Sequence, residues 1–444
     1  MKPHRVSKME NDSCSQIQVN FFTKHKAYSV PQTPFSIPVT VSCDDLSALI
    51  NSLLQQENIL NEDKKVEFDF LISDQYITES LQKHITKQDV ETEDVVKIEY
   101  IEKKAAPWPE KMMLQNDWVS SIAVSSDCIL SGSYDNMVYV WDMQGNCLNS
   151  INEHTQAVKA VNWIRKDKEK AIFLSSSLDQ TIKICECPLN EGRSSCLYVC
   201  KGHTKSVDCL AVHPNEMKFC SGSWDKTLKL WSSDLSTNPD DGDDENIQKK
   251  SKTEQEHKRN ITRTPLMTMT GHTEAVSSVI WSEDREVLSC GWDHTIRVWD
   301  AGSGINKHTL TGGKAFNCIS YSPHSKLIAS AGADRHVRLW DHRIRDGAVF
   351  QKTLTSHDGW LSSVAWSPRN QFMLVSGSYD QTLILWDTRS ATTPLHVLRG
   401  HNDKVMCVDW STEQFVISGG ADNQLIVHRV SGKDEDTNDD DSTV

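Results

Sequence analysis

The chain is an acidic polypeptide of 444 residues with a net charge of −14, and 38% of its residues are hydrophobic. No apolar run approaches the roughly 18–20 residues that a membrane-spanning helix needs, and the first residues lack the apolar core of a secretory signal. We therefore expect no association with a membrane. Nucleic-acid phosphates attract Lys and Arg, so a chain with this charge is a poor general ligand for them, and direct RNA contact is left open.

The 13 cysteines are odd in number and irregularly spaced, and the sequence contains no Cys-x-x-Cys pair. Zinc sites and disulfide frameworks both need a regular spacing that is missing here. We interpret these side chains as reduced, buried small hydrophobes of an intracellular protein. The sequence therefore predicts no metal site of its own and no cofactor.

Residues 16–102 alternate strands with one helix, after a segment at 1–15 that we expect to be disordered. Strands are predicted over 17–23, 35–41, 67–72 and 95–101. Pro38 cannot donate to a strand ladder, which favours a sheet edge for the second strand. Asp44 or Asp45 is the predicted N-cap of a helix over 46–54.

This order of elements predicts a small α+β domain of the ubiquitin-like (β-grasp) type. The domain does not end in the Gly-Gly of a conjugated modifier but runs into a linker at 103–109. We therefore expect a fixed adaptor domain.

Residues 110–430 contain a repeat in which a Ser is followed four residues later by an Asp. The seven Ser-to-Asp segments are 131–135, 175–179, 221–225, 289–293, 330–334, 376–380 and 418–422. The aspartates are 44, 46, 68, 41, 46 and 42 residues apart, and five of these intervals are close to the period of WD repeats. Alternating apolar strands between the turns predict a mainly β protein with a seven-bladed WD40 propeller. Residues 110–115 are predicted to pair with 425–430 and to close the ring.

Ser, His and Asp recur together in most repeats, usually with a Trp six residues after the Asp. A catalytic triad occurs once, in a cleft, whereas this set recurs at fixed spacing. The resemblance to WD repeats implies structural tetrads in which His, Ser and Trp satisfy a buried carboxylate. The three complete sets are His203, Ser221, Asp225 and Trp231; His272, Ser289, Asp293 and Trp299; and His357, Ser376, Asp380 and Trp386. Blades one and five lack the His, while Cys185 and His428 replace the Trp in blades two and seven, so we expect those blades to be less rigid.

Two polar segments interrupt or follow the repeats. The insert at 233–262 lies within the interval of 68 residues, and the tail at 431–444 has six acidic side chains and one Lys. Both are too polar to form a core, so we predict that they are disordered. The basic runs at 249–252 and 257–259 fit either a nuclear-import signal or a solvated loop.

Large aromatic residues occupy two repeated positions, directly before the turn Asp and directly before the first strand of a blade. The six are Trp118, Tyr134, Trp224, Trp292, Trp360 and Tyr379. Both positions are expected to face one side of a propeller. Trp and Tyr dominate interface hot spots, so the pattern predicts a partner-binding face, with packing between blades as the alternative.

The whole arrangement resembles proteins that combine a Notchless-type N-terminal domain with a WD propeller. The resemblance is carried by FDFLI at 68–72, LQKHITK at 81–87, the strand at 95–100 and DWVSS at 117–121. With seven blades and an insert after blade three, the chain is similar to the WD-repeat subunits of the Pescadillo–block-of-proliferation complex.

That resemblance implies a non-enzymatic assembly factor for the large (60S) ribosomal subunit, required for ribosomal RNA maturation. The implied partners are Pescadillo, the block-of-proliferation protein, pre-60S particles and the AAA ATPase midasin. The implied location is the nucleus, nucleolus and nucleoplasm.

The resemblance further implies that an acidic side chain of the N-terminal domain completes a metal site in midasin, for release from pre-60S particles. The matching position is Glu93, with Glu91 and Asp94 as neighbours in the same loop. A hard divalent cation with an open position accepts one carboxylate oxygen. The alternative is that all three are ordinary solvated carboxylates.

Two other functions use parts of the same pattern. A WD-repeat substrate adaptor in ubiquitin signalling fits the same two domain types. An enzyme using the repeated Ser, His and Asp would need one exposed set that departs from the others, and the sequence offers none. It also contains no Gly-Lys-Ser phosphate loop and no zinc signature, so we predict that the protein is not an enzyme.

Overall fold

The computed structural model describes residues 16–430, except 32, 62–64, 89–93, 168, 190–193, 216, 236–260 and 344–351. It divides into two compact units, Met1–Ala105 with Arg389–Thr393, and Ala106–Thr388 with Pro394–Val444. The segments at 1–15 and 431–444, the basic runs of the insert, and Glu91 and Glu93 lie outside the described residues. The predictions made for them are not addressed by the fold.

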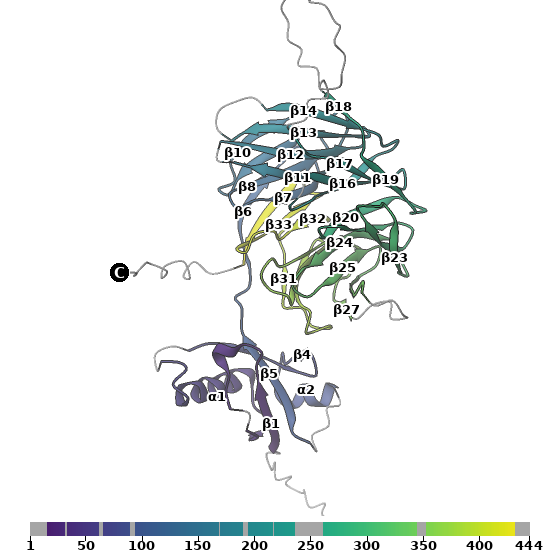
Figure 1. The fold of residues 1–444 in the computed structure, drawn as a ribbon. Coiled ribbons are helices and arrows are strands. Elements are labelled where there is room, and N and C mark those ends of the chain that lie inside the picture. The colour runs from purple at the N-terminus through teal and green to yellow at the C-terminus, as the bar shows by residue number, and fades with distance from the viewer. Residues whose placement is uncertain are drawn as a thin grey trace, which may run out of the picture. The chain divides into compact units, whose positions relative to one another are not determined.

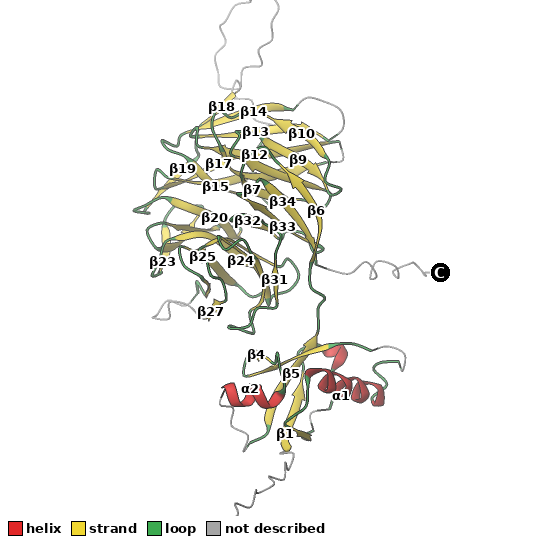
Figure 2. Cartoon of the chain, turned by 180° about the vertical axis from the view of Figure 1, so that it is seen from behind, coloured by secondary structure: helices red, strands yellow, loops and turns green. Residues whose placement is uncertain are grey.

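The N-terminal unit is a mixed five-stranded sheet with two α-helices and one short 3-10 helix. Its elements are β1 Gln16–Phe22, η1 Lys26–Tyr28, β2 Phe35–Pro38, α1 Cys43–Gln56, β3 Phe68–Ile72, β4 Gln75–Tyr76, α2 Leu81–Gln88 and β5 Val96–Glu102. The strand order is β2-β1-β5-β3-β4, with β1 parallel to β5. Strand β2 lies at the edge, as Pro38 predicted. Figure 2 shows that both α-helices belong to this unit.

Helix α1 begins earlier than its apolar pattern indicates. Ser42 is the N-cap, and it forms a capping box in which Asp45 is the third helical residue, so the prediction that Asp44 or Asp45 caps the helix is wrong. The reason is that the cap is a backbone position outside the helix, and the Ser42 hydroxyl reaches the Asp45 N–H from there. Leu46, Ile50 and Leu54 are fully buried in the core of the unit.

The second unit is the predicted seven-bladed propeller (Figure 1). Blade one contains β7 Val119–Val124, β8 Cys128–Ser133, β9 Val138–Asp142 and β10 Cys147–Ile151. Blade two contains β11 Val158–Lys166, β12 Lys170–Ser177, β13 Thr181–Pro188, β14 Ser195–Lys201 and β18 Ile261–Arg263. Blade three contains β15 Val207–Val212, β16 Lys218–Ser223, β17 Thr227–Ser232 and β19 Met267–Thr270.

The remaining blades repeat the same antiparallel order. Blade four contains β20 Val276–Glu283, β21 Glu286–Gly291, β22 Thr295–Asp300 and β23 Asn306–Thr311. Blade five contains β24 Phe316–Ser322, β25 Leu327–Gly332, β26 His336–Trp340 and β27 Lys352–Thr355. Blade six contains β28 Leu361–Trp366, β29 Met373–Ser378, β30 Leu383–Asp387 and β31 His396–Leu398. Blade seven contains β32 Val405–Asp409, β33 Phe415–Gly420, β34 Gln424–Arg429 and, from the other end of the repeats, β6 Trp108–Leu114.

The ring is closed at two radii. The first strands contact one another in the cycle β7, β11, β15, β20, β24, β28, β32 and back to β7. At the outer edge of blade seven β6 pairs antiparallel with β34, with Met113 opposite Leu425. This confirms the predicted closing strand and joins segments more than 300 residues apart in the chain.

The end of the insert is ordered, contrary to the expectation of disorder throughout 233–262. Residues Ile261–Arg263 form β18, which pairs parallel with β14 at the outer edge of blade two. Two local contacts hold this strand in place, and the polar composition of the insert does not indicate them. Ile261 packs with the apolar cluster around Tyr198, and the Arg263 guanidinium lies 3.5 Å from the Tyr198 ring centroid. Among the described helices, none has the length and apolarity required to cross a membrane.

Candidate functional site

The predicted tetrads in blades three, four and six each come together around one serine hydroxyl. The His Nε2–Ser Oγ distances are 2.8 Å for His203 and Ser221, 2.7 Å for His272 and Ser289, and 2.8 Å for His357 and Ser376. The Trp Nε1 group donates to the same Ser Oγ at 2.8 Å in all three, from Trp231, Trp299 and Trp386. The His Nδ1–Asp Oδ2 distances are 2.7 Å for Asp225, 2.8 Å for Asp293 and 2.8 Å for Asp380.

The chemistry of these sets is structural. Trp N–H can only donate and a carboxylate can only accept. Trp therefore donates a hydrogen bond to Ser, Ser donates to His, and His donates to Asp. Burial raises the pKa of Asp225, but hydrogen bonds from His203 and Thr227 lower it overall, well below its ordinary value. Ser221 is completely buried, and its hydroxyl accepts a hydrogen bond from Trp231 and donates one to His203. Such a hydroxyl is not exposed to a substrate as a nucleophile.

Blades two and seven keep three of the four members. In blade two, His154 bridges Ser175 and Asp179 with 2.8 Å contacts on both ring nitrogens, and only the Trp is replaced. In blade seven, His401 bridges Ser418 and Asp422 in the same way. His428 takes the Trp position in blade seven, and neither of its ring nitrogens has a hydrogen-bond partner.

Blades one and five replace the missing His differently. In blade one, Gln115 Nε2 donates to Ser131 Oγ, and the hydroxyl of Tyr139 donates to Asp135. In blade five, Arg338 forms an ion pair with Asp334. These partners were not predicted. The available signal for Gln115 is its place four residues before the first strand of blade one, where blades two, three, four, six and seven have His.

The six predicted aromatic residues do lie at two coupled positions of the repeat. In every blade the N–H before the turn Asp donates to the carbonyl of the residue before the first strand, for example Tyr134 to Trp118 and Tyr379 to Trp360. The exposed fractions of the four Trp side chains are 44% for Trp118, 40% for Trp224, 46% for Trp292 and 56% for Trp360. Each of these four rings is therefore partly accessible to a partner.

These aromatic residues contact each other in three pairs. The ring centroids are 5.5 Å apart for Trp118 and Tyr134, 4.9 Å for Trp224 and Trp292, and 6.4 Å for Trp360 and Tyr379. The pair of Trp224 and Trp292 joins blades three and four. Packing between blades and exposure to a partner therefore occur together at this face, and the two readings of the sequence are not exclusive.

Charged groups accompany the aromatic pairs. Lys159 Nζ donates to the Tyr134 hydroxyl at 2.8 Å, and Lys404 Nζ lies 5.2 Å from the Tyr379 ring centroid. The Trp224 Nε1 group donates to Asp208. Burial lowers the pKa of Lys159, but the nearby Asp208 and Tyr134 outweigh it and raise the pKa overall. We call the six aromatic residues with Lys159, Asp208 and Lys404 the aromatic face.

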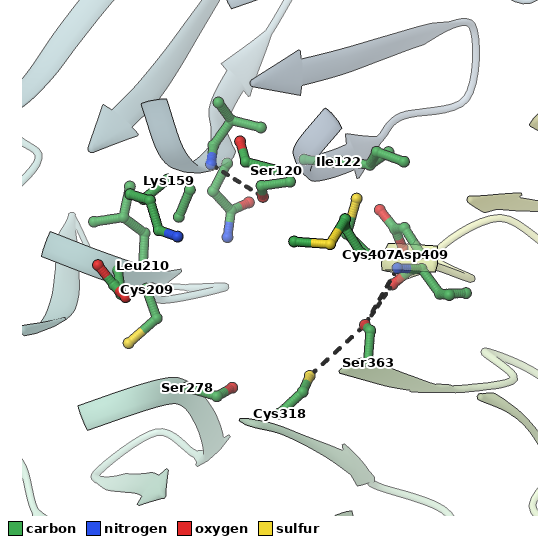
Figure 3. A pocket seen from close by; sticks show the side chains of 18 of the residues that line it. Ser120, Ile122, Lys159, Cys209, Leu210, Ser278, Cys318, Ser363, Cys407 and Asp409 are labelled. Atoms are coloured by element: carbon green, nitrogen blue, oxygen red, sulfur yellow. Dashed lines mark hydrogen bonds between the residues drawn. The ribbon is translucent and has the colours of Figure 1, made fainter. Parts of the chain in front are cut away.

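A polar cavity of about 440 Å³ lies inside the ring of first strands. Figure 3 shows Ser120, Lys159, Cys209, Cys318 and Asp409 around it, from blades on all sides. Asp409 is half-buried; its removal from solvent raises its pKa, and it accepts a hydrogen bond from the Val124 N–H at 2.7 Å. Over the described residues, no group of three or more His, Cys, Asp or Glu side chains is arranged to hold a metal.

The predicted midasin-binding loop is only partly visible. Asp94 is exposed two residues before β5 begins, and it follows residues 89–93, which lie outside the described residues. Glu93 and Glu91 therefore remain sequence predictions. In the described residues, α2 ends at Gln88 and β5 begins at Val96.

Comparison with known families covers both units. Residues 17–85 match the NLE (NUC135) domain family. Seven segments match the WD domain, G-beta repeat family, at 111–142, 145–186, 194–232, 263–300, 304–341, 348–387 and 392–429.

The similarity to individual proteins extends over nearly the whole chain. The chain is 52% identical over 416 residues to a protein of Nematostella vectensis named ribosome biogenesis protein WDR12 homolog, covering 93% of this chain and 99% of that one. Proteins of the same name are 43% identical in Ixodes scapularis, covering 93% and 98% of the two chains, and 39% identical in Anopheles gambiae, covering 96% and 97%.

Proposed function

The chain belongs to the family of ribosome biogenesis protein WDR12 homologs, and we propose that it is a non-enzymatic assembly factor of the large (60S) ribosomal subunit. The observation that carries this proposal is the near full-length similarity, which includes the NLE domain and all seven repeats. The names of the relatives support a role in ribosome biogenesis, and such a role places the protein in the nucleus or nucleolus. The 60S subunit and ribosomal RNA maturation are the finer part of the proposal.

In this proposal the propeller is the scaffold. The aromatic face supports it, because exposed Trp rings and half-buried Tyr rings held by tight turns lose little entropy when a partner covers them. Its partners are Pescadillo and the block-of-proliferation protein within pre-60S particles. The buried tetrads support a scaffold rather than an enzyme, because their hydroxyl and carboxylate groups are satisfied within each blade.

The N-terminal domain is the proposed handle for midasin. Glu93 supplies one carboxylate oxygen to a divalent cation held by the ATPase, with Glu91 and Asp94 as neighbours in the same loop. A pull by the ATPase on this carboxylate would be transmitted along β5 into residues 103–107, because the predicted linker at 103–109 already gives way to β6 at Trp108. The factor would then be removed from the particle as one piece.

The first experiment compares wild type with Glu93→Ala, each purified from cells and assayed for midasin, Pescadillo and ribosomal precursor RNA. We expect midasin to be lost and Pescadillo retained. Glu91→Ala and Asp94→Ala test the register, and Glu57→Ala, an exposed carboxylate at the far end of α1, is the matched control. Recovery of neither midasin nor precursor RNA with wild type would show that the ribosome-assembly assignment is wrong.

The second experiment tests the aromatic face. Trp118→Ala with Trp360→Ala removes two exposed rings, and we expect the affinity for Pescadillo and block-of-proliferation protein to fall by about 30-fold or more. Met217→Ala with Ile305→Ala is the control, because these side chains are 65% and 64% exposed in the turns at the opposite ends of the strands. Equal loss from both double variants would argue against a specific role for the face.

A ubiquitin-signalling adaptor is the second candidate, favoured by the strand order β2-β1-β5-β3-β4 with α1 between β2 and β3. That order is the β-grasp arrangement. The same purification separates the two functions, because an adaptor would bring down ligase subunits and no ribosomal precursors.

A further inference from the structure

Blade two departs from the other blades at the position where the tetrad Trp normally lies. Cys185 takes that position on β13, and it is 1% exposed within the apolar cluster of the blade. It has no N–H to donate to Ser175, so its residue type is not explained by the tetrad. A second thiol, Cys196 on β14, is 8% exposed and belongs to the same cluster.

The two thiols are direct partners across the sheet. In the antiparallel pairing of β13 and β14, Cys185 lies opposite Cys196, next to a register shift. Directly opposed residues of antiparallel strands have Cα atoms about 4.5–5.5 Å apart, within the range of about 4.4–6.8 Å that a disulfide spans. Both cysteines are free thiols on the same side of the sheet.

Two nearby cysteines provide an internal contrast. Cys187 on β13 lies opposite Ala171 of β12, and Cys200 on β14 lies opposite Ile182. Cys200 also belongs to the cluster on the other side of the sheet. Neither has a thiol as its register partner, although each lies on the same strand as one member of the opposed pair.

The interaction between the opposed thiols makes them chemically unequal. A hydrogen bond from Cys185 lowers the pKa of Cys196 despite its burial, and Lys183 adds to the effect. The same hydrogen bond and burial raise the pKa of Cys185. Cys196 is thus the thiol of the pair with the lowered pKa, and the thiolate is the nucleophile in thiol oxidation.

We propose that Cys185 and Cys196 form a dithiol modification site that hydrogen peroxide converts to a cross-strand disulfide. The Cys196 thiolate attacks one peroxide oxygen, the O–O bond breaks, and the departing hydroxide takes up a proton to become water. The Cys185 sulfur then attacks the resulting sulfenic acid, the S–O bond breaks, and a second water leaves. Two thiols and one peroxide give one disulfide and two waters, and a dithiol reductant reverses the change.

The disulfide would link β13 covalently to β14 in the outer part of blade two. Strand β14 carries β18 on its other side, through the pairing of Tyr198 with Ile261. A covalent link from β13 to β14 therefore also steadies the strand to which the end of the insert attaches. We expect slower amide exchange in β13, β14 and β18 after oxidation, with the other blades unchanged.

The test uses the reduced full-length chain treated with hydrogen peroxide, then alkylation and trypsin digestion without reductant. The sequence places Cys185 and Cys187 on the peptide 184–193, and Cys196 and Cys200 on the peptide 194–201. We expect these two peptides to be linked, lighter together by two hydrogen atoms, and separated again by dithiothreitol. Fragmentation then assigns the bond to Cys185 and Cys196.

Matched variants decide the assignment. Cys185→Ser or Cys196→Ser should abolish the link, whereas Cys187→Ser and Cys200→Ser should retain it at the wild-type rate. A link that survives Cys185→Ser, or wild-type peptides that stay unlinked while other cysteines are oxidised, would overturn the proposal. The wild-type digest needs no substitution, so the proposal stays testable if a variant fails to fold.

Discussion

A single serine hydroxyl organises each complete blade. In blade three Ser221 accepts from Trp231 and donates to His203, and all of these groups are removed from water. The hydrogen bonds matter mainly because breaking one leaves a buried polar group unsatisfied. The loss of stability on replacing a member of these sets should therefore depend on how many buried groups are left without a hydrogen bond.

Ser221→Ala should destabilise the propeller more than Ser175→Ala. Ser221→Ala leaves both Trp231 Nε1 and His203 Nε2 without a hydrogen-bond partner. Ser175→Ala leaves only His154 Nε2 without one, because blade two has Cys185 in place of the Trp. Each buried polar group that loses its partner lowers the free energy of unfolding by about 1–3 kcal/mol. Urea unfolding of the two variants measures the difference, and equal midpoints would contradict this account.

His428 should make the stability of blade seven depend on pH. Burial lowers its pKa from 6.5 to about 4, with His401 adding to the effect. The unfolded chain therefore binds the proton first, so stability is full above about pH 6.5 and falls by up to about 3 kcal/mol as the pH drops to 4. His428→Trp, which offers Ser418 the missing N–H, should flatten this part of the profile, whereas the exposed His324→Gln should not. Urea midpoints at pH 5 and pH 7.5 measure the slopes.

Elements in the N-terminal unit depend on local signals as well as burial. Helix α1 combines a capping box at its start with an apolar stripe of Leu46, Ile50 and Leu54. Neither of these alone would set its bounds, because the stripe starts later than the cap. The helix lies between β2 and β3 in the chain, and its Asn51 hydrogen-bonds to Val66 on both backbone groups.

Ser42→Ala should loosen α1 specifically. The change removes the side-chain acceptor for the Asp45 N–H and should cost about 1 kcal/mol. Hydrogen exchange should be faster in the first turn of α1 and in its contacts. Ser52→Ala in the same helix, where the hydroxyl only reaches the Leu49 carbonyl, should leave exchange unchanged or slower.

At its outer edge, the propeller is closed by one strand that comes from the beginning of the repeat region. Strand β6 completes blade seven, and Met113 enters the core shared with blade one, where it is 4% exposed. Its neighbour Met112 is 57% exposed. Adjacent residues of the same type therefore contribute very differently to closure of the ring.

Met113→Ala should lower the stability of the propeller by about 2–5 kcal/mol, the usual cost of emptying a buried site of this size. Met112→Ala should change it by less than about 0.5 kcal/mol. Chemical denaturation of the full chain gives both values. Similar losses for the two variants would mean that β6 does not close the ring through its buried side.

The sequence determined the architecture because repetition makes a local signal unmistakable. The spacing of Ser221, Asp225 and Trp231 recurs often enough to predict blades, tetrads and the closing strand, and apolar alternation located four strands of the N-terminal domain. It also placed Trp118 and Trp360 at equivalent positions. These features are periodic along the chain, so they can be found without knowledge of contacts.

Only the tertiary structure decided which residues substitute for missing members of the pattern. Gln115 replaces a His, β18 emerges from a polar insert, and Cys185 meets Cys196, because each depends on a partner brought close by strand pairing. Composition and periodicity carry no information about such partners. Contacts across a sheet are set by the register of the paired strands, and bulges such as the one beside Cys185 shift that register in ways that periodicity does not show.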